Sequence, residues 1–206
     1  MPDYQFIHQL NNTELGRTAT HDCYVYVCRE SVPLLTFMDE GSRYLFRYKR
    51  DASVSGELFY THTSTGEYRV SGCKRFFDAG SVNAGDCVVL ERCGDVFLVD
   101  FVRREDMIVF NKLRDRWQCR NEDRLVGILD KELPTFKDKA IGSLKVTPLG
   151  EMMKRTQTVN TYSLSFNGEK LQDGEIYNLF TVAGGYCLSS AFKDKVVTIE
   201  RSGHEQ

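Results

Sequence analysis

The sequence lacks any apolar run of the roughly 18 residues that a membrane-spanning helix needs. It also lacks a bias of charge, since 27 lysines and arginines stand against 29 acidic residues, for a net charge of −2. A histone-like protein that binds nucleic acid by bulk charge is therefore excluded, although a local basic face is not. The first residues, Met1 to Tyr4, carry an acid and no basic-then-apolar stretch, so we expect no secretory signal.

Known catalytic motifs are absent as well. No acidic residue stands two positions before a lysine, as in the commonest metal-dependent nucleases, and no histidine does so, as in phospholipase-D-type nucleases. There is no G-x-S-x-G elbow, no Walker A or G-x-G-x-x-G loop and no H-E-x-x-H motif. We therefore expect no catalytic residue, no metal and no cofactor. A Cys–His pair stays open as an alternative, because such partners are distant in the chain.

The cysteines are unsuited to a zinc site or to a disulfide framework. There are seven of them, an odd number, and none forms a C-x-x-C pair. A chain of 206 residues is also long enough to fold around an apolar core without disulfides. We expect reduced thiols that serve as small apolar core residues in a cytosol.

Strand patterns dominate the first half of the chain. Strands are expected over 23–28, 42–50 and 58–61, where β-branched and aromatic residues gather or alternate with polar ones. The apolar runs 87–92 and 96–102 are joined by Cys93-Gly94-Asp95, and this short turn with a glycine predicts an antiparallel hairpin. We expect an open, mostly antiparallel pseudobarrel whose ends are plugged by short helices.

The chain changes in character after about residue 118. The charged stretch Lys131 to Lys139 contains Pro134, which predicts a linker or surface loop. Short strands are expected over 161–166, 176–182, 186–189 and 196–200. Helices are expected over 32–40, 105–117 and 149–156. These patterns predict a barrel over residues 4–118, and a small α+β extension of unknown role over 119–206.

Two polar segments interrupt the strands, Leu15 to Asp22 and Thr63 to Arg75. Both combine glycine, hydroxyl side chains and Arg, His or Glu, which are the groups that read base edges and fix phosphates in duplex DNA. Residues 42–75 include seven basic and three acidic residues, a local charge of +4. Polar loops with arginines also occur on ordinary solvated faces, and Glu67 with Arg69 has the simpler interpretation of an ion pair on an exposed strand.

At these two segments the sequence resembles a known family. Phe6-Ile7-x-x-Leu10, Leu15-Gly16-Arg17-Thr18-x-x-His21 and Tyr24-x-Tyr26-Val27 resemble the first DNA-contacting arm in the amino-terminal effector domain of the EcoRII restriction endonuclease. Glu67-Tyr68-Arg69-Val70-Ser71 resembles the core of its second arm. The hairpin that begins at Asn83 is similar to one in plant B-three transcription-factor domains. These domains, and the recognition domain of the BfiI restriction enzyme, share the DNA-binding pseudobarrel fold.

The resemblance implies that two arms enter the major groove of double-stranded DNA and read a short site, which is CC(A/T)GG for EcoRII-type enzymes. It implies base contacts by Arg17, Thr18, Thr20, His21, Glu67, Tyr68, Arg69 and Ser71. It implies phosphate contacts by Arg47, Lys49, Lys74 and Arg75. Departures in the second arm, where Ser64-Thr65-Gly66 replaces a more basic stretch and Tyr68 replaces a lysine, imply fewer phosphate contacts and a different base preference.

We therefore expect a non-catalytic DNA-recognition module of a bacterial restriction system, located in the cytoplasm. Its nuclease is expected either in another part of a longer protein or in a separate chain. Two alternatives from other classes stay open. One is a small cytosolic enzyme with a Cys/His site between the two halves of the chain, and the other is a protein-interaction domain.

Overall fold

The structure is a computed structural model that describes residues 1–18, 21–29, 35, 37–137, 140–190 and 196–200, the last range as backbone only. The chain forms two compact units, Met1–Glu105 with Asp194–Gln206 (unit 1) and Asp106–Lys193 (unit 2). Strands account for 58% of the structure, and the described residues include one short α-helix. The expected mostly β, barrel-like fold is confirmed. The units divide near residue 105, whereas the sequence patterns placed the division at 118.

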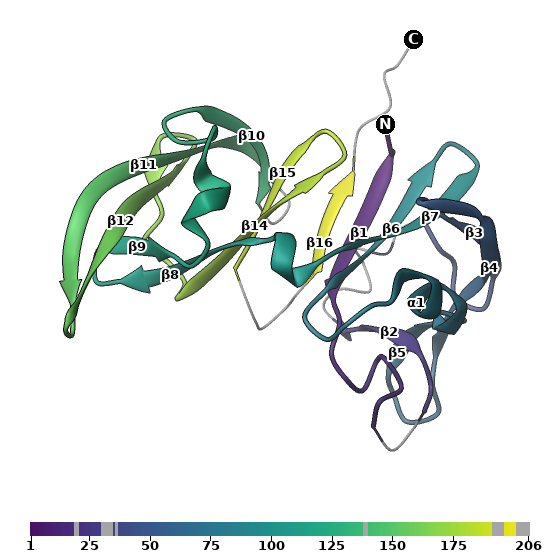
Figure 1. The fold of residues 1–206 in the computed structure, drawn as a ribbon. Helices are drawn as coiled ribbons and strands as arrows, with labels where there is room; N and C mark the ends of the chain where they lie inside the picture. Colours follow the sequence, from purple (N-terminus) through teal and green to yellow (C-terminus); the bar gives the residue numbers. More distant parts are fainter. Residues whose placement is uncertain (19–20, 30–34, 36, 138–139, 191–195, 201–206) are drawn as a thin grey trace, which may run out of the picture. The chain divides into compact units, whose positions relative to one another are not determined.

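Unit 1 is built on an eight-stranded sheet in the order β16-β1-β6-β7-β3-β4-β5-β2 (Figure 1). Its elements are β1 (Tyr4–Gln9), β2 (Tyr24–Val27), β3 (Arg43–Tyr48), β4 (Asp51–His62), β5 (Tyr68–Ser71), α1 (Lys74–Gly80), β6 (Cys87–Cys93), β7 (Val96–Val102) and β16 (Val196–Glu200), with the 3-10 turn η2 (Arg104–Asp106) after β7. Neighbouring strands are antiparallel except β3 and β7. Among the described residues β16 and β2 remain the sheet edges, so the barrel is nearly closed rather than closed.

The core of unit 1 lies on the inner face of this sheet. Phe6, Phe46, Val70, Phe76 and Leu90 are each at most 1% exposed there. The predicted hairpin is present as β6 and β7, whose register runs from Cys87↔Val102 to Cys93↔Val96. The four consecutive apolar residues Cys87 to Leu90 of β6 are all buried, as expected for the apolar run in the sequence.

Unit 2 is a closed barrel. Its strands are β8 (Ile108–Leu113), β9 (Arg116–Cys119), β10 (Glu132–Lys137), β11 (Ala140–Lys154), β12 (Gln157–Phe166), β13 (Glu169–Lys170), β14 (Ile176–Val182) and β15 (Gly185–Ser190), with the 3-10 turn η3 (Glu122–Leu125). The order β11-β10-β15-β14-β8-β9-β12 closes into a ring because β11 also pairs with β12. Trp117, Leu144, Leu164 and Leu179 belong to its separate core.

The predictions of helices in this region were wrong. Residues 105–117 form η2, β8 and the start of β9, and Arg114 has a positive φ of 59° in the turn between the two strands. Residues 149–156 belong to the β11–β12 hairpin, which is paired over ten positions with a bulge between Pro148 and Gly150. The cross-strand pairs Met153↔Thr158 and Lys154↔Gln157 of this hairpin override the helix propensity of Met153 and Lys154.

The loop predicted over 131–139 was also wrong, because residues 132–137 form β10. Pro134 fits within this strand since it lies before Thr135, where pairing with β15 begins, and therefore one side of β10 needs no N–H at that position. Of the helix predicted over 32–40, residues 32–34 and 36 lie outside the described residues, and residues 37–40 form no helix but lead into a β-bridge between Glu40 and Tyr60. The described part of the chain contains no helix long and apolar enough to cross a membrane.

Candidate nucleic-acid interface

The loop between β1 and β2 is anchored by a buried carboxylate. Glu14 is 1% exposed, and it accepts hydrogen bonds from the backbone N–H of Asn11 at 3.0 Å and of Tyr26 at 2.8 Å. Its Oε1 also lies 2.6 Å from Nε2 of His8. These contacts join the beginning of the loop to both flanking strands, so the polar residues that follow are held on a fixed base.

Two residues of this loop adopt left-handed backbone conformations. Gly16 has φ +65°, and a Cβ at this position would lie 2.8 Å from the carbonyl oxygen of His21. His21 itself has φ 53°, which is uncommon for a residue other than glycine. The loop thus folds back tightly on itself, and the exposed imidazole of His21 lies beside this close approach.

The remaining side chains predicted in the first arm point toward solvent or lie outside the described residues. Arg17 is exposed, and its Nη2 donates to the carbonyl oxygen of Val82 at 2.9 Å, which ties the loop to the segment after α1. Thr18 is exposed. Thr20 lies outside the described residues.

The second predicted arm is not one loop but three elements. Only Thr63 to Glu67 forms a turn, in which the Thr63 hydroxyl accepts from the N–H of Glu67 at 3.1 Å and Gly66 has a positive φ of 87°. The next four residues form β5, and α1 begins at Lys74. The prediction of a continuous excursion was wrong because Val70 is fully buried and carries β5 into the sheet.

Arg69 lies on the outer face of β5 between an acid and an aromatic ring. Its Nε and Nη2 donate to Oε2 of Glu67 at 2.9 and 2.5 Å. The guanidinium carbon lies 4.0 Å from the ring centroid of Tyr24 on the neighbouring strand. These two contacts hold the guanidinium in one place, and the side chain is 21% exposed.

The other two predicted base contacts of the second arm differ in their surroundings. The ring of Tyr68 stacks on His62 with 4.4 Å between centroids and an interplanar angle of 14°. Ser71 is half-buried on β5, opposite Tyr24 of β2 and Phe59 of β4. Both residues thus belong to the sheet rather than to a free loop.

The four predicted phosphate contacts separate into two groups. Lys74 and Arg75 are exposed at the start of α1, where Nζ of Lys74 lies 2.8 Å from Asp78, and this bond raises the pKa of the lysine. Arg47 is exposed on β3 opposite Ser55, six residues along β4 from the position that faces Arg69, or about 20 Å away.

Lys49 has a structural partner. Its Nζ lies 2.8 Å from the carboxylate of Glu91, which is 2% exposed and also accepts from Nε2 of Gln5 at 2.7 Å. The ammonium therefore compensates a buried negative charge inside unit 1.

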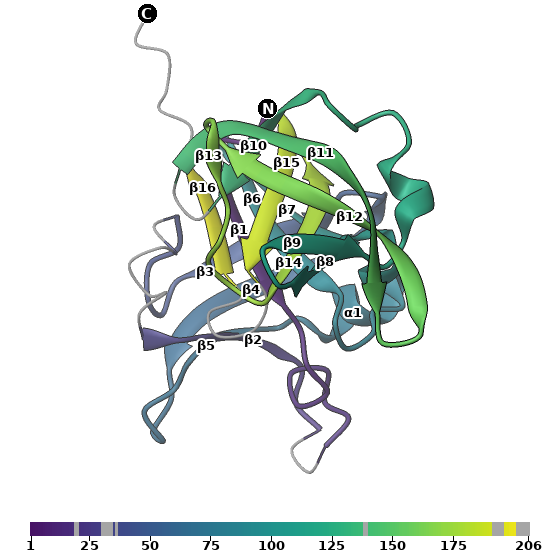
Figure 2. The ribbon, with the colours of Figure 1, turned by 90° about the vertical axis from the view of Figure 1, so that its left-hand side faces the viewer.

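The two loops lie at opposite ends of one short ribbon. The pairing of β2 with β5 runs from Tyr24↔Ser71 to Val27↔Tyr68. The first loop therefore joins the ribbon at the Tyr24 end, and the Thr63–Glu67 turn joins it at the Tyr68 end. Both views show the two loops projecting from the same side of unit 1 (Figures 1 and 2). A four-residue ribbon spans about 13 Å, which is comparable to the roughly 12 Å width of the major groove of B-DNA.

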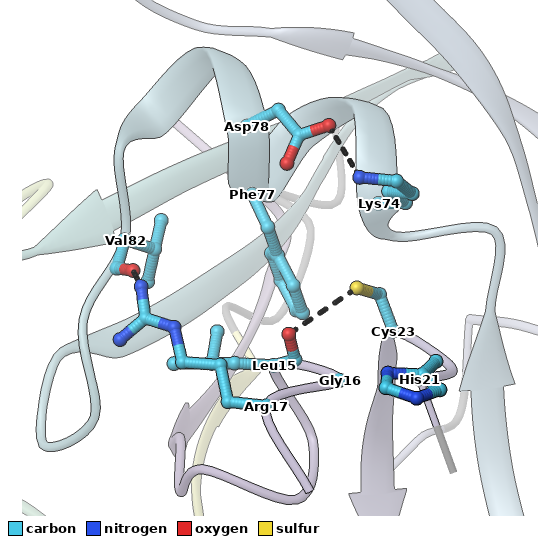
Figure 3. A pocket seen from close by; sticks show the side chains of 9 residues that line it. All are labelled: Leu15, Gly16, Arg17, His21, Cys23, Lys74, Phe77, Asp78 and Val82. Atoms are coloured by element: carbon cyan, nitrogen blue, oxygen red, sulfur yellow. Dashed lines mark hydrogen bonds and ion pairs between the residues drawn. The ribbon is translucent and has the colours of Figure 1, made fainter. Parts of the chain in front are cut away.

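A pocket of about 320 Å³ opens beside the first loop (Figure 3). It is lined by Leu15, Gly16, Arg17, His21, Cys23, Lys74, Phe77, Asp78 and Val82. A second hollow adjoins it, since His21, Cys23, Lys74 and Asp78 line both, and it extends to Asp22, Gly72 and Arg75. The structure thus brings the predicted residues Arg17, His21, Lys74 and Arg75 together, while Glu67, Tyr68 and Arg69 lie toward the other end of the ribbon.

The thiol of Cys23 lies in this pocket near His21, which makes it relevant to the Cys/His alternative (Figure 3). It donates a hydrogen bond to the carbonyl oxygen of Leu15 at 3.5 Å. Burial raises the pKa of this thiol. A catalytic thiolate needs the opposite, a lowered pKa, so the arrangement favours a protonated sulfur that serves as part of the pocket wall.

Sequence reasoning missed several residues of this region, among them Glu14, Phe77 and Asp78. The spacing of Lys74 and Asp78, four residues apart, is a signal for an ion pair on a helix. No comparable signal marks Glu14, because an acid in a polar segment has the pattern of an exposed residue.

The described residues contain no group of three or more His, Cys, Asp or Glu side chains that could hold a metal ion. In comparisons with known proteins, no family model and no curated protein sequence matches the chain.

Proposed function

We propose that unit 1 binds double-stranded DNA and reads a short site in the major groove, as the recognition part of a bacterial restriction system similar to EcoRII. The observation that carries the proposal is the position of two polar loops on one side of the unit, at the ends of a ribbon about as long as the groove is wide. The arrangement allows both loops to enter one groove without rearrangement of the sheet.

The chemistry of the exposed side chains supports this function. Arg17 and His21 on the first loop, and Arg69 on the ribbon, carry donors that fit guanine O6 and N7. Lys74 and Arg75 are exposed beside the first loop, where a basic side chain reaches the phosphate backbone. On this proposal Arg69 reads one base pair. Lys74 and Arg75 of α1 bind the phosphates of a duplex of any sequence.

Cleavage is not assigned to this chain. The protonated state that burial favours for Cys23 works against a catalytic pair of Cys23 and His21. The nuclease is proposed to lie in another part of a longer protein or in a separate chain, and the pair is proposed to act in the bacterial cytoplasm.

The test is selection from random-sequence duplexes with the full chain, followed by gel shifts at two salt concentrations. We expect enrichment of a short motif and affinity that falls as salt rises. Retention of no duplex even at low salt would overturn the proposal and leave the enzyme and protein-interaction alternatives.

Two variants separate base reading from phosphate binding. Arg69→Ala is expected to cost about 1–3 kcal/mol on the selected site and to relax specificity at one position. Lys74→Ala is expected to weaken binding to all sequences alike, and to reduce the slope of log affinity against log salt concentration by about 1. Lys131→Ala, at an exposed lysine of unit 2, is the matched control and should change neither the specificity nor the salt dependence of the affinity.

A further inference from the structure

The pocket beside the first loop has an apolar floor and a polar rim. Leu15, Phe77 and Val82 form the floor, and each is at most 8% exposed. The side chain of Phe77 extends from α1 toward the backbone of Leu15 (Figure 3). The rim consists of Arg17, His21, Lys74 and Asp78. The exposed lining is more polar than apolar, so hydrogen bonds from the rim hold a ligand there more than apolar contact does.

The size of the pocket limits what it can hold. Its volume of about 320 Å³ lies at the lower end of the range of roughly 300–1,000 Å³ for small-molecule sites. One planar ring system fits such a space, with its edge toward the polar rim. The ring of Phe77 supplies an aromatic surface at the floor.

The rim contains a donor and an acceptor side by side. Nζ of Lys74 and Oδ2 of Asp78 are 2.8 Å apart, and both side chains are exposed, so the pair can open around a ligand at little cost. A carboxylate accepts from the exocyclic amine of cytosine or adenine. When Lys74 moves to a phosphate, as the proposed function requires, the carboxylate of Asp78 is released and matches the amine edge of such a base.

The position of the pocket gives a base a route into it. Arg17 and His21 belong to the loop that the proposed function inserts into the major groove, and they also line the pocket. We propose that the pocket receives one unstacked nucleobase, cytosine or adenine, extruded from the duplex that the two loops bind. The inference rests on the proposed function and adds to it a second mode of reading, through the edge of a flipped base.

Two variants test the pocket without touching the proposed base contacts of the loops. Cys23→Phe fills the space from a half-buried position whose thiol makes only a long hydrogen bond, at 3.5 Å. Asp78→Asn removes the carboxylate charge at an exposed position and keeps the shape of the side chain. Val96→Phe, which adds a ring at a position of the same unit that is 45% exposed, is the control. Thermal unfolding of each variant confirms that it is folded.

The measurement uses the selected duplex with 2-aminopurine placed at one position at a time. We expect a several-fold rise in fluorescence at one position when the full chain binds, because the base leaves the stack. The rise should be absent with Cys23→Phe, reduced with Asp78→Asn and unchanged with Val96→Phe, while gel shifts still show binding by all three. A mismatch at that position should tighten wild-type binding about tenfold, because less pairing is lost.

The outcomes separate this inference from the function on which it rests. A duplex that is bound with no fluorescence rise at any position, or with a rise that persists in Cys23→Phe, overturns the base pocket and leaves the two-loop proposal intact. A chain that binds no duplex overturns both.

Discussion

The guanidinium carbon of Arg69 lies 4.0 Å from the ring centroid of Tyr24 across the β2–β5 ribbon. The ring supports the guanidinium from one side, and Glu67 fixes its Nε and Nη2 from the other. An arginine held in this way loses less conformational freedom when it contacts a base, so the ring of Tyr24 should contribute to the affinity for DNA.

Removing the aromatic ring of Tyr24 should weaken DNA binding, whereas removing only its hydroxyl should leave the affinity unchanged. Tyr24→Leu is expected to reduce affinity for the selected duplex two- to fivefold, which corresponds to about 0.5–1 kcal/mol of cation–π interaction. Tyr24→Phe keeps the ring and should keep the affinity. Tyr26→Leu, on the same strand, is the control. Equal effects of Tyr24→Leu and Tyr26→Leu on the dissociation constant would contradict this role.

Lys49 and Arg47 should separate stability from DNA binding. Lys49→Met leaves the buried carboxylate of Glu91 without its cation, so the free energy of unfolding should fall by about 1–3 kcal/mol in urea denaturation at pH 7. Arg47→Met, two residues earlier and exposed, should leave stability within about 0.5 kcal/mol. The affinity for DNA should change in the opposite order, with Arg47→Met the weaker binder. If Lys49→Met weakened binding without loss of stability, Lys49 would be a phosphate contact after all.

Tyr60 should make the protein less stable at high pH. Burial raises the pKa of its hydroxyl to about 12, with smaller contributions from Glu40 and Tyr68. Because the unfolded chain loses this proton near pH 10, the stability that the neutral hydroxyl contributes is complete below pH 10 and is lost as pH rises to about 12. Urea denaturation between pH 8 and pH 12 should therefore show a smaller decline for Tyr60→Phe than for the wild type.

The same variant should be harmless at pH 7. Among the described residues the buried Tyr60 hydroxyl has no hydrogen-bond partner. Removing it also removes this unsatisfied polar group, so Tyr60→Phe should be neutral or stabilising by about 1 kcal/mol. A loss of stability at pH 7 would indicate that the hydroxyl has a partner in solution.

Cys23 should react slowly with alkylating agents near neutral pH. Burial raises the pKa of its thiol, so the thiolate fraction at pH 7 is below that of an exposed cysteine. Mass spectrometry after iodoacetamide treatment should show that Cys23 in the folded chain is modified more slowly than in urea, with the rate rising above pH 9. Rapid modification at pH 7 would instead indicate an activated thiolate and favour the enzyme alternative.

The sequence predicted those strands whose signals are local. Cys93-Gly94-Asp95 between two apolar runs specified the β6–β7 hairpin, since the turn and the two runs are all read from neighbouring residues. Residues 149–156 carried a local signal that misled, because Leu149, Met152 and Met153 favour a helix. Pairing with β12 makes that segment a strand, and the turn between the two strands, Arg155-Thr156, lacks the glycine that marks the β6–β7 turn.

The site was predictable to the extent that polar residue types mark loops. Arg17 and His21 were identified from composition and from the resemblance, and both line the pocket. Phe77 was not identified, because an apolar residue in a helix has the pattern of a core residue whether or not it borders a pocket. Glu91 was not identified as buried, since its partners Gln5 and Lys49 are 86 and 42 residues away in the chain.

The central claim, that the first loop and the β2–β5 ribbon read one duplex, is tested most directly by repeating the selection with Arg17→Ala and with Arg69→Ala. The account predicts that each variant loses preference at a different base pair of the same short site, with the remaining positions unchanged. Relaxation at the same base pair in both variants, or an unaltered motif in both, would contradict it.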